Sequence, residues 1–131
     1  MFVDASALTA MLVGDGDAQA LLARLQNYGV RETSPMAVWE TVVAAARILG
    51  LPISESQVAV EAYLRLVGIE VSPISAASRN LALAAFDRYG KGRHPAALNF
   101  GDCFAYASAQ EAGVPMLYKG EDFPLTDIRA A

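Results

Sequence analysis

Residues 99–118, NFGDCFAYASAQEAGVPMLY, hold one complete helix pattern and the strand pattern that follows it. Asn99 is a residue type that caps helix N-termini, and Gly113 is one that commonly follows a helix end. Between these two signals lie the residues Phe100–Ala112. The apolar run Val114–Tyr118 then has the length of a buried strand. This stretch therefore predicts a helix followed directly by a strand.

The same alternation of short apolar runs and longer helical patterns occurs along the whole chain. Strands are predicted at Met1–Val3, Val30–Thr33, Ile69–Ser72, Val114–Tyr118 and, near the end, Thr126–Ile128. Helices are predicted over Ser6–Val13, Asp17–Asn27, Pro35–Leu49, Ser54–Val67, Ser75–Tyr89 and Phe100–Ala112. Strands separated by helices favour parallel pairing. We therefore expect an α/β fold with a short, mainly parallel central sheet flanked by helices.

The composition is that of a folded chain with an apolar surplus. Of its 131 residues, 54% are hydrophobic and 18% are charged, where about 45–50% and about 25% are typical. We expect one domain, residues 1–131, with apolar surface covered by a partner, another copy or both. The single cysteine, Cys103, and the single histidine, His94, exclude an internal disulfide and a Cys/His zinc site. No long apolar run is present, so we expect no membrane span and a cytoplasmic location.

The charge balance argues against nucleic acid binding at first sight. Ten Lys and Arg residues and 14 Asp and Glu residues give a net charge of −4, whereas phosphate affinity usually needs a basic excess. Four acids, however, occupy unusual positions. Asp4 directly follows the first strand, and Asp122 follows the fourth. Glu40 lies inside an apolar helix, and Asp102 lies at a helix start.

Three of these carboxylates also have a plain structural explanation. Asp4 can cap the helix that begins near Ser6. Asp102 comes three residues after Asn99, which imitates a capping box. Asp122 lies in a turn, where acids are usually solvated.

Glu40 is harder to explain in structural terms. The helix Pro35–Leu49 is apolar nearly all round, which predicts that it is buried. The i±4 neighbours of Glu40 are Met36 and Ala44, so it has no local charged partner. Pairing with Arg47, two turns later, is the structural alternative.

Together the four acids favour a metal site. On a parallel sheet their positions can converge at one edge, where four carboxylates would repel one another unless a cation held them. Oxygen ligands without His or Cys select hard ions such as Mg²⁺ or Mn²⁺. Such ions are a common means of cleaving a phosphodiester. Without these four acids the net charge rises from −4 to 0 (−4 + 4), so the acidic balance does not exclude nucleic acid.

A basic cluster precedes Asp102 in the sequence and could contact a phosphate backbone. Its members are Arg88, Lys91, Arg93 and His94, and Lys119 beside Asp122 is a further candidate RNA contact. A solvated basic loop is the alternative.

The sequence resembles the PIN-domain ribonucleases, and among them the VapC-type toxins of toxin–antitoxin pairs, from end to end. The matching segments are Phe2–Ala7, Ser34–Pro35 leading to Glu40, Arg93–Ala96, Leu98–Cys103, Tyr118–Phe123 and Thr126–Ile128. The resemblance implies a PIN-like α/β/α sandwich. It also implies a Mg²⁺- or Mn²⁺-dependent endoribonuclease that acts on structured RNA, transfer RNA or ribosomal RNA.

The resemblance also implies roles for individual residues. Asp4, Glu40, Asp102 and Asp122 match the acidic quartet of the family, which is both catalytic and metal-binding, and Glu40 would bind a second ion or orient the attacking water. Ser6 and Asn99 match polar positions that border the site. Glu121 or Asp127 could replace Asp122, since both are close in sequence. Family members usually form homodimers and are silenced by a cognate VapB-type antitoxin.

Other classes fit less well. A PIN nuclease of RNA maturation without a toxin role remains an alternative, as does a catalytically inactive PIN-like binding module, although all four acids are present. A receiver domain normally has adjacent acids after its first strand, and only Asp4 stands there. No Gly-Xaa-Gly-Xaa-Xaa-Gly follows a strand and no Gly-Xaa-Ser-Xaa-Gly is present, which disfavours dinucleotide binding and serine hydrolysis.

Overall fold

Four two-residue strands form a fully parallel sheet in the order β3-β2-β1-β4. They are β1 (Phe2–Val3), β2 (Glu32–Thr33), β3 (Glu70–Val71) and β4 (Met116–Leu117). The structure is a computed structural model and describes all residues from Met1 to Ala131. Between β1 and the edge strand β4, Phe2 is in register with Met116 and Val3 with Leu117. The expected parallel sheet is confirmed.

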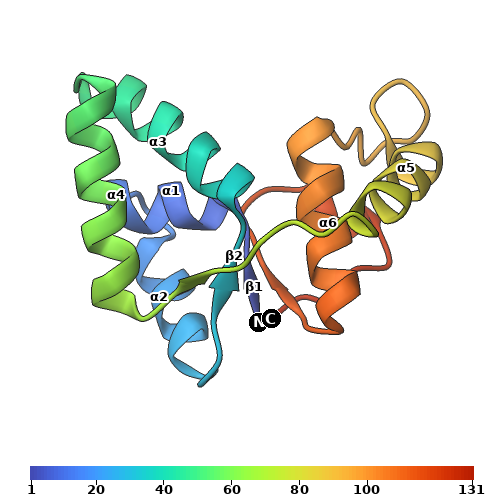
Figure 1. Cartoon of the computed structure of the whole chain (residues 1–131), viewed down its shortest axis with the longest axis horizontal. Helices are drawn as coiled ribbons and strands as arrows, with labels where there is room; N and C mark the ends of the chain where they lie inside the picture. The colour runs from blue at the N-terminus through green and yellow to red at the C-terminus, as the bar shows by residue number, and fades with distance from the viewer.

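Six helices cover the sheet in two groups (Figure 1). Their bounds are α1 (Ala5–Val13), α2 (Ala18–Gln26), α3 (Pro35–Leu49), α4 (Ile53–Val67), α5 (Ser78–Tyr89) and α6 (Phe100–Ala112). Helices α1 to α4 lie on one side of β1, and α5 and α6 lie on the other. This arrangement confirms the α/β/α sandwich.

The two faces of the sheet build two separate cores. Phe2 and Met116 belong to the core formed with α5 and α6, whereas Val3 and Leu117 belong to the core formed with α1 to α4. Successive side chains of a strand point to opposite faces, so even two-residue strands contribute to both layers. All four side chains are buried, and this explains why the apolar runs predicted the strands.

Side-chain caps begin the helices at the carboxyl end of the sheet. The Ser34 hydroxyl accepts a hydrogen bond from Ala37 N at 3.1 Å, and Pro35 occupies the first turn of α3. Gly113 ends α6 with a φ of +66°, a conformation that glycine adopts without steric cost.

The end of the chain differs from the prediction. Thr126–Ile128 is not a strand; Phe123–Leu125 forms the 3₁₀ helix η1, and the only β pairing that follows is an isolated bridge between Met116 and Ala130. The Thr126 hydroxyl donates to Phe123 O at 2.7 Å and accepts from Ile128 N at 3.2 Å. These local hydrogen bonds compete with the hydrogen bonds that a β-strand would form with the sheet.

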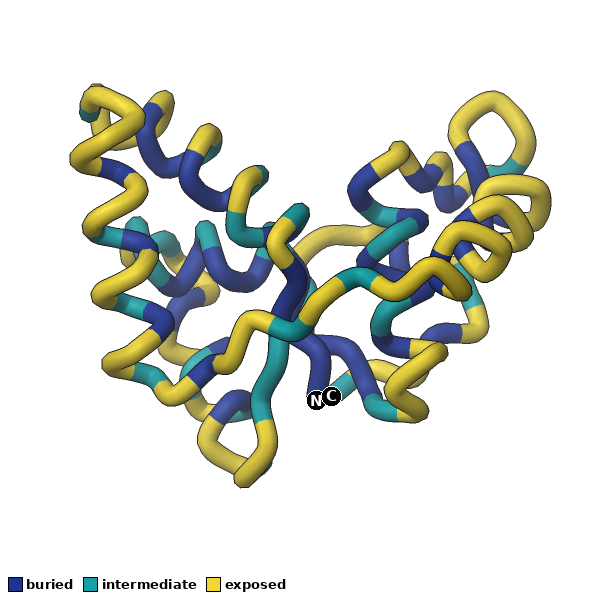
Figure 2. The backbone as a smooth tube through the Cα atoms, viewed as in Figure 1, coloured by how far each residue is buried: buried dark blue, intermediate teal, exposed yellow.

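Helix α3 is only partly buried, contrary to the prediction. Buried and exposed residues alternate along it in Figure 2, and Trp39 is 66% exposed and Ile48 50% exposed. The helix packs on α1, α4 and the start of α6, and these contacts leave side chains such as Trp39 and Ile48 uncovered. No single helix is long and apolar enough to cross a membrane; α3 and α4 meet such a test only as a pair, and they are bent by 118°.

Candidate active site

A cavity of about 330 Å³ opens where β1 and β4 end and α1, α3 and α6 approach one another. Its charged lining residues are Asp4, Asp15, Glu40, Arg47, Asp102 and Lys119. In open parallel sheets the carboxyl ends of the strands are the usual location of a binding site. Three of the four acids expected at the site therefore share one cavity.

Asp4 is both a helix cap and a member of this cavity. The residue is 4% exposed, and its Oδ2 accepts hydrogen bonds from Ser6 N at 2.9 Å and from Ser6 Oγ at 2.5 Å. Burial raises the pKa of Asp4 above its usual range, while the bonds from Ser6 act in the opposite direction. Asp4 therefore caps α1 and also lines the cavity.

Asp102 likewise caps a helix, α6, and lines the cavity. It forms a capping box with Asn99, in which Asn99 N donates to Asp102 Oδ2 at 2.8 Å and Asp102 N donates to Asn99 Oδ1 at 3.0 Å. Burial, followed by the charges of Asp4 and Asp122, raises the pKa of Asp102 to about 6. The hydrogen bond from Asn99 N lowers the pKa, but by less than burial raises it.

Glu40 approaches from α3 and lies against the first turn of α6. A Cβ atom at Gly101 would overlap Glu40 Oε1 and lie 2.6 Å from Glu40 Cδ. Burial, followed by the charges of Asp4 and Asp102, raises the pKa of Glu40 to about 7. The alternative pairing with Arg47 does not form. Gly101 thus leaves the space that this carboxylate occupies, a role that the sequence did not predict. The one hint in the sequence is a glycine inside a predicted helix, where glycine is unfavourable.

Asp122 lies beside the cavity rather than in its lining. It is exposed in the loop after β4, and its charge contributes to the raised pKa of Asp102. Of its two possible replacements, Glu121 is also exposed. Asp127 is engaged elsewhere, because it accepts from Tyr106 Oη at 2.6 Å and pairs with Arg88 at 3.0 Å.

Ser6 joins Asp4 to the loop that carries Asp122. Lys119 N donates to Ser6 Oγ at 3.0 Å, and Ser6 Oγ donates in turn to Asp4 Oδ2. The ammonium group of Lys119 pairs with Asp15 at 2.6 Å and with Asp17 at 2.9 Å. These ion pairs hold the loop after β4 against the turn between α1 and α2, another contact that the sequence did not indicate.

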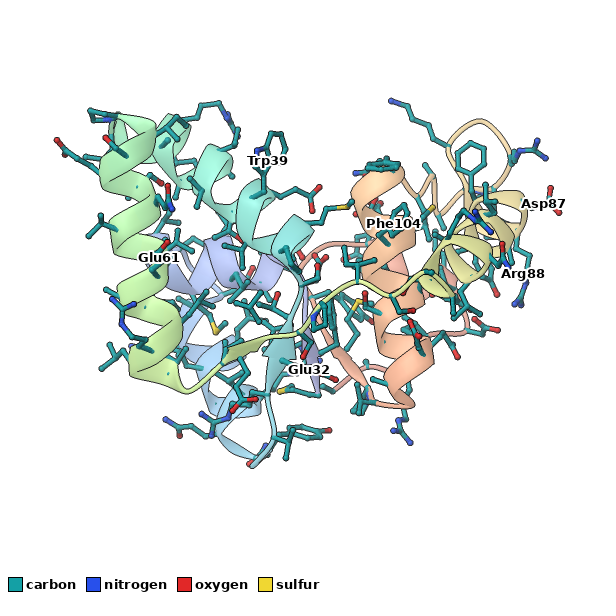
Figure 3. All side chains as sticks on the ribbon, in the orientation of Figure 1. Glu32, Trp39, Glu61, Asp87, Arg88 and Phe104 are labelled. Atoms are coloured by element: carbon teal, nitrogen blue, oxygen red, sulfur yellow. The ribbon has the colours of Figure 1, made fainter.

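The predicted basic cluster lies away from the cavity. Figure 3 places Asp87 and Arg88 on the outer side of α5, remote from α3. Arg93 pairs with Asp87 at 3.0 Å. His94 Nδ1 accepts from Ala96 N at 3.1 Å, and Lys91 forms no ion pair or side-chain hydrogen bond. Among the predicted RNA contacts only Lys119 lines the cavity.

The donor set fits a hard divalent cation, although the side chains do not form a closed metal cluster as they stand. Asp4, Glu40 and Asp102 offer oxygen donors only. Burial raises the pKa of each, and for Glu40 and Asp102 the charges of neighbouring carboxylates raise it further. A cation would remove this repulsion. The space beside Gly101 admits the Glu40 carboxylate to the cavity that Asp4 and Asp102 also line.

Known proteins resemble this chain over almost its whole length. The family model of the PIN domain matches residues 1–128. Ribonuclease VapC of Mycolicibacterium smegmatis is 38% identical over 130 residues, which are 99% of this chain and 98% of that protein. Ribonuclease VapC30 of Mycobacterium tuberculosis is 38% identical over 98% of this chain and 95% of its own. A VapC ribonuclease of Rhizobium meliloti is 36% identical over 97% of this chain and 98% of its own.

The fold is also that of a solved structure. The crystal structure of Mycobacterium tuberculosis VapC20, described as a Sarcin-Ricin loop cleaving toxin, superposes with a TM-score of 0.77 over 99% of this chain and 97% of that one. Its sequence identity of 21% supports the fold alone. The family match and the curated relatives together show that this chain belongs to the PIN domain family and, within it, to the VapC-type ribonucleases.

Proposed function

We propose that this chain is a metal-dependent endoribonuclease that hydrolyses phosphodiester bonds in transfer RNA or ribosomal RNA. The observation that carries the proposal is the convergence of Asp4, Glu40 and Asp102 in one cavity at the carboxyl edge of the sheet. The relatives named as VapC ribonucleases support RNA as the substrate. The related fold of a toxin that cleaves the Sarcin-Ricin loop makes ribosomal RNA a substrate to test.

Asp4, Asp102 and Asp122 would hold Mg²⁺ or Mn²⁺. When bound, such an ion polarises the phosphoryl oxygen and lowers the pKa of a water molecule. Glu40 would hold a second ion or accept the proton of the attacking water. Ser6 fixes the orientation of the Asp4 carboxylate through its two hydrogen bonds.

We further propose that a VapB-type antitoxin controls the enzyme and that the chain forms a homodimer. The relatives carry VapC names, which supports the toxin role. Exposed apolar side chains support both the antitoxin complex and the homodimer, since each would cover such surface. Leu66 is 81% exposed, Phe100 is 69% exposed, and Trp39 projects from α3 (Figure 3).

Cleavage of a pool of transfer RNA and ribosomal RNA by the purified protein tests the enzymatic proposal. We expect cuts at a few discrete sites with Mg²⁺ or Mn²⁺, and none with EDTA. Asp102→Asn, purified in parallel, excludes a contaminating nuclease. A folded protein free of antitoxin that cuts nothing with either ion would contradict the proposal and favour a binding module.

A further inference from the structure

Arg47 lies on the same stripe of α3 as Glu40. Glu40, Ala44, Arg47 and Ile48 all line the cavity, and their spacing of four, seven and eight residues is that of one helix face. Arg47 is two turns, or about 10.5 Å of helix axis, beyond Glu40. It is exposed, so the stripe runs from a half-buried carboxylate to a solvent-exposed guanidinium.

Arg47 is the cation of the cavity that has no acidic partner. The four ion pairs of the structure involve Arg88, Arg93 and Lys119, and none involves Arg47. Lys119 also lines the cavity, but Asp15 and Asp17 neutralise its ammonium group. Arg47 is therefore available to an anion from outside the chain.

A structural role for Arg47 explains only part of its placement. A basic residue in the last turn of a helix interacts favourably with the helix dipole, and both Arg47 in α3 and Arg65 in α4 hold such a position. Arg65 is exposed as well but does not line the cavity. The dipole accounts for a cation at the helix end and not for its position at the mouth of an acidic site.

We propose that Arg47 is a substrate-positioning residue, which binds an RNA phosphate at the mouth of the cavity, next to the phosphate that is cleaved. This inference rests on the proposed function. A guanidinium group offers paired donors that match two phosphate oxygens, and it stays charged at any working pH. Glu40, Asp102 and Asp4 act on the scissile phosphate, and Arg47 fixes where the strand enters.

The salt dependence of RNA binding tests the contact directly. Binding of unfractionated transfer RNA would be measured in EDTA, where no cleavage occurs, between about 50 and 200 mM NaCl, the range over which phosphate contacts are strongly salt-sensitive. In Arg47→Gln we expect the slope of log affinity against log salt to fall by about 0.7–0.9, the loss of one phosphate contact. Arg65→Gln is the matched control and should keep the slope of the parent.

Kinetics with Mg²⁺ give a second, independent readout. Arg47→Gln should raise KM with a smaller effect on kcat, because the contact binds substrate away from the reacting atoms. Arg47→Lys keeps the charge and should restore the salt slope. Each variant should melt within a few degrees of the parent, since neither Arg47 nor Arg65 forms an ion pair and the glutamine variants lose only an interaction with the helix dipole.

These measurements distinguish a wrong role for Arg47 from a wrong proposed function. A parent that binds and cleaves RNA, with unchanged slope and KM in Arg47→Gln, would overturn the role of Arg47 alone. Equal losses in Arg47→Gln and Arg65→Gln would also overturn it, because they would indicate a general charge effect. A parent that neither binds nor cleaves RNA would overturn both.

Discussion

Gly101 and Glu40 lie so close together that any side chain at position 101 would occupy the space of the Glu40 carboxylate. Gly101 lies in the first turn of α6 and Glu40 lies on α3, so this contact joins the two helical groups at the site. The absent side chain therefore determines where the third carboxylate of the cavity lies.

Gly101→Ala should disable cleavage without unfolding the protein. The new methyl group would displace the Glu40 carboxylate, and a misplacement of about 1 Å can cost about 100-fold in rate. Alanine is favoured over glycine inside a helix by up to about 1 kcal/mol, so the melting temperature should stay near that of the parent. Cleavage rate and thermal melting would be measured together.

Gly16→Ala is the matched control for this change, because a Cβ there meets nothing within 4 Å. A double variant gives a sharper test. If Gly101 acts through Glu40, Gly101→Ala should cause no further loss in a Glu40→Ala background. Full activity of Gly101→Ala would contradict the assignment of Glu40 to the site.

Asp102→Asn should separate the cap of α6 from its chemistry. The amide oxygen of asparagine can still accept the hydrogen bond from Asn99 N, so the change in stability should be within about 1 kcal/mol. Loss of a carboxylate that would hold the metal should reduce cleavage at least about 100-fold. Cleavage rate and urea unfolding measure the two effects.

Asp127→Asn should have the opposite effects, a loss of stability with cleavage unchanged. This carboxylate accepts from Tyr106 and pairs with Arg88 outside the cavity, so its loss should lower stability by about 1 kcal/mol and leave cleavage intact. Cleavage lost in Asp127→Asn and kept in Asp102→Asn would reverse the two assignments.

Local patterns predicted most of the fold. Short apolar runs predicted β1 and β4 because both faces of the sheet are buried, so that each residue of these strands, Phe2, Val3, Met116 and Leu117, lies in a core. The last predicted strand is wrong because Thr126 bonds to its own neighbours, which its residue type does not reveal. The burial of α3 was overestimated because an apolar helix shows the same composition whether its own chain or a partner covers it.

Contacts between distant parts of the chain were harder to predict. Asp4 and Asp102 could be selected from their positions after a strand and at a helix start, and each serves as a cap as well as lining the cavity. Nothing local to Gly101 identifies Glu40 as its neighbour. The pairing of Lys119 with Asp15 spans 104 residues, and one sequence contains no signal for such a pair.

Ser6→Ala should weaken metal binding more than it weakens the fold. The hydroxyl of Ser6 donates to Asp4 and accepts from Lys119 N. Its loss leaves Asp4 Oδ2 with only the bond from Ser6 N and the amide of Lys119 without its acceptor. Groups that orient metal ligands commonly contribute about 10–100-fold to metal affinity. Calorimetric titration with Mn²⁺ would measure this loss.

Ser108→Ala is a suitable control for Ser6→Ala, because the Ser108 hydroxyl donates only to Phe104 O on its own helix. It should keep the Mn²⁺ affinity of the parent. Parental affinity in Ser6→Ala would show that Asp4 needs no support from this hydroxyl.

The raised pKa values predict that the metal-free protein loses stability as the pH rises. Glu40 has a pKa of about 7 in the folded chain and 4.5 as its ordinary value. The folded state therefore binds more protons than the unfolded state between these values, and the free energy of unfolding falls with rising pH in this range. Below about pH 4.5 the effect is absent, because Glu40 is protonated in both states.

Glu40→Gln should abolish this contribution. In EDTA the variant should gain about 1–2 kcal/mol over the parent at pH 8, after allowance for solvent screening, and little at pH 4.5. Mn²⁺ should reduce the difference at pH 8, because a cation offsets the repulsion that Glu40 experiences from Asp4 and Asp102. Urea unfolding at the two pH values, with and without Mn²⁺, measures all four conditions. An equal gain at both pH values would show that Glu40 is not held near buried charge, and the carboxylate cluster would then not form in solution.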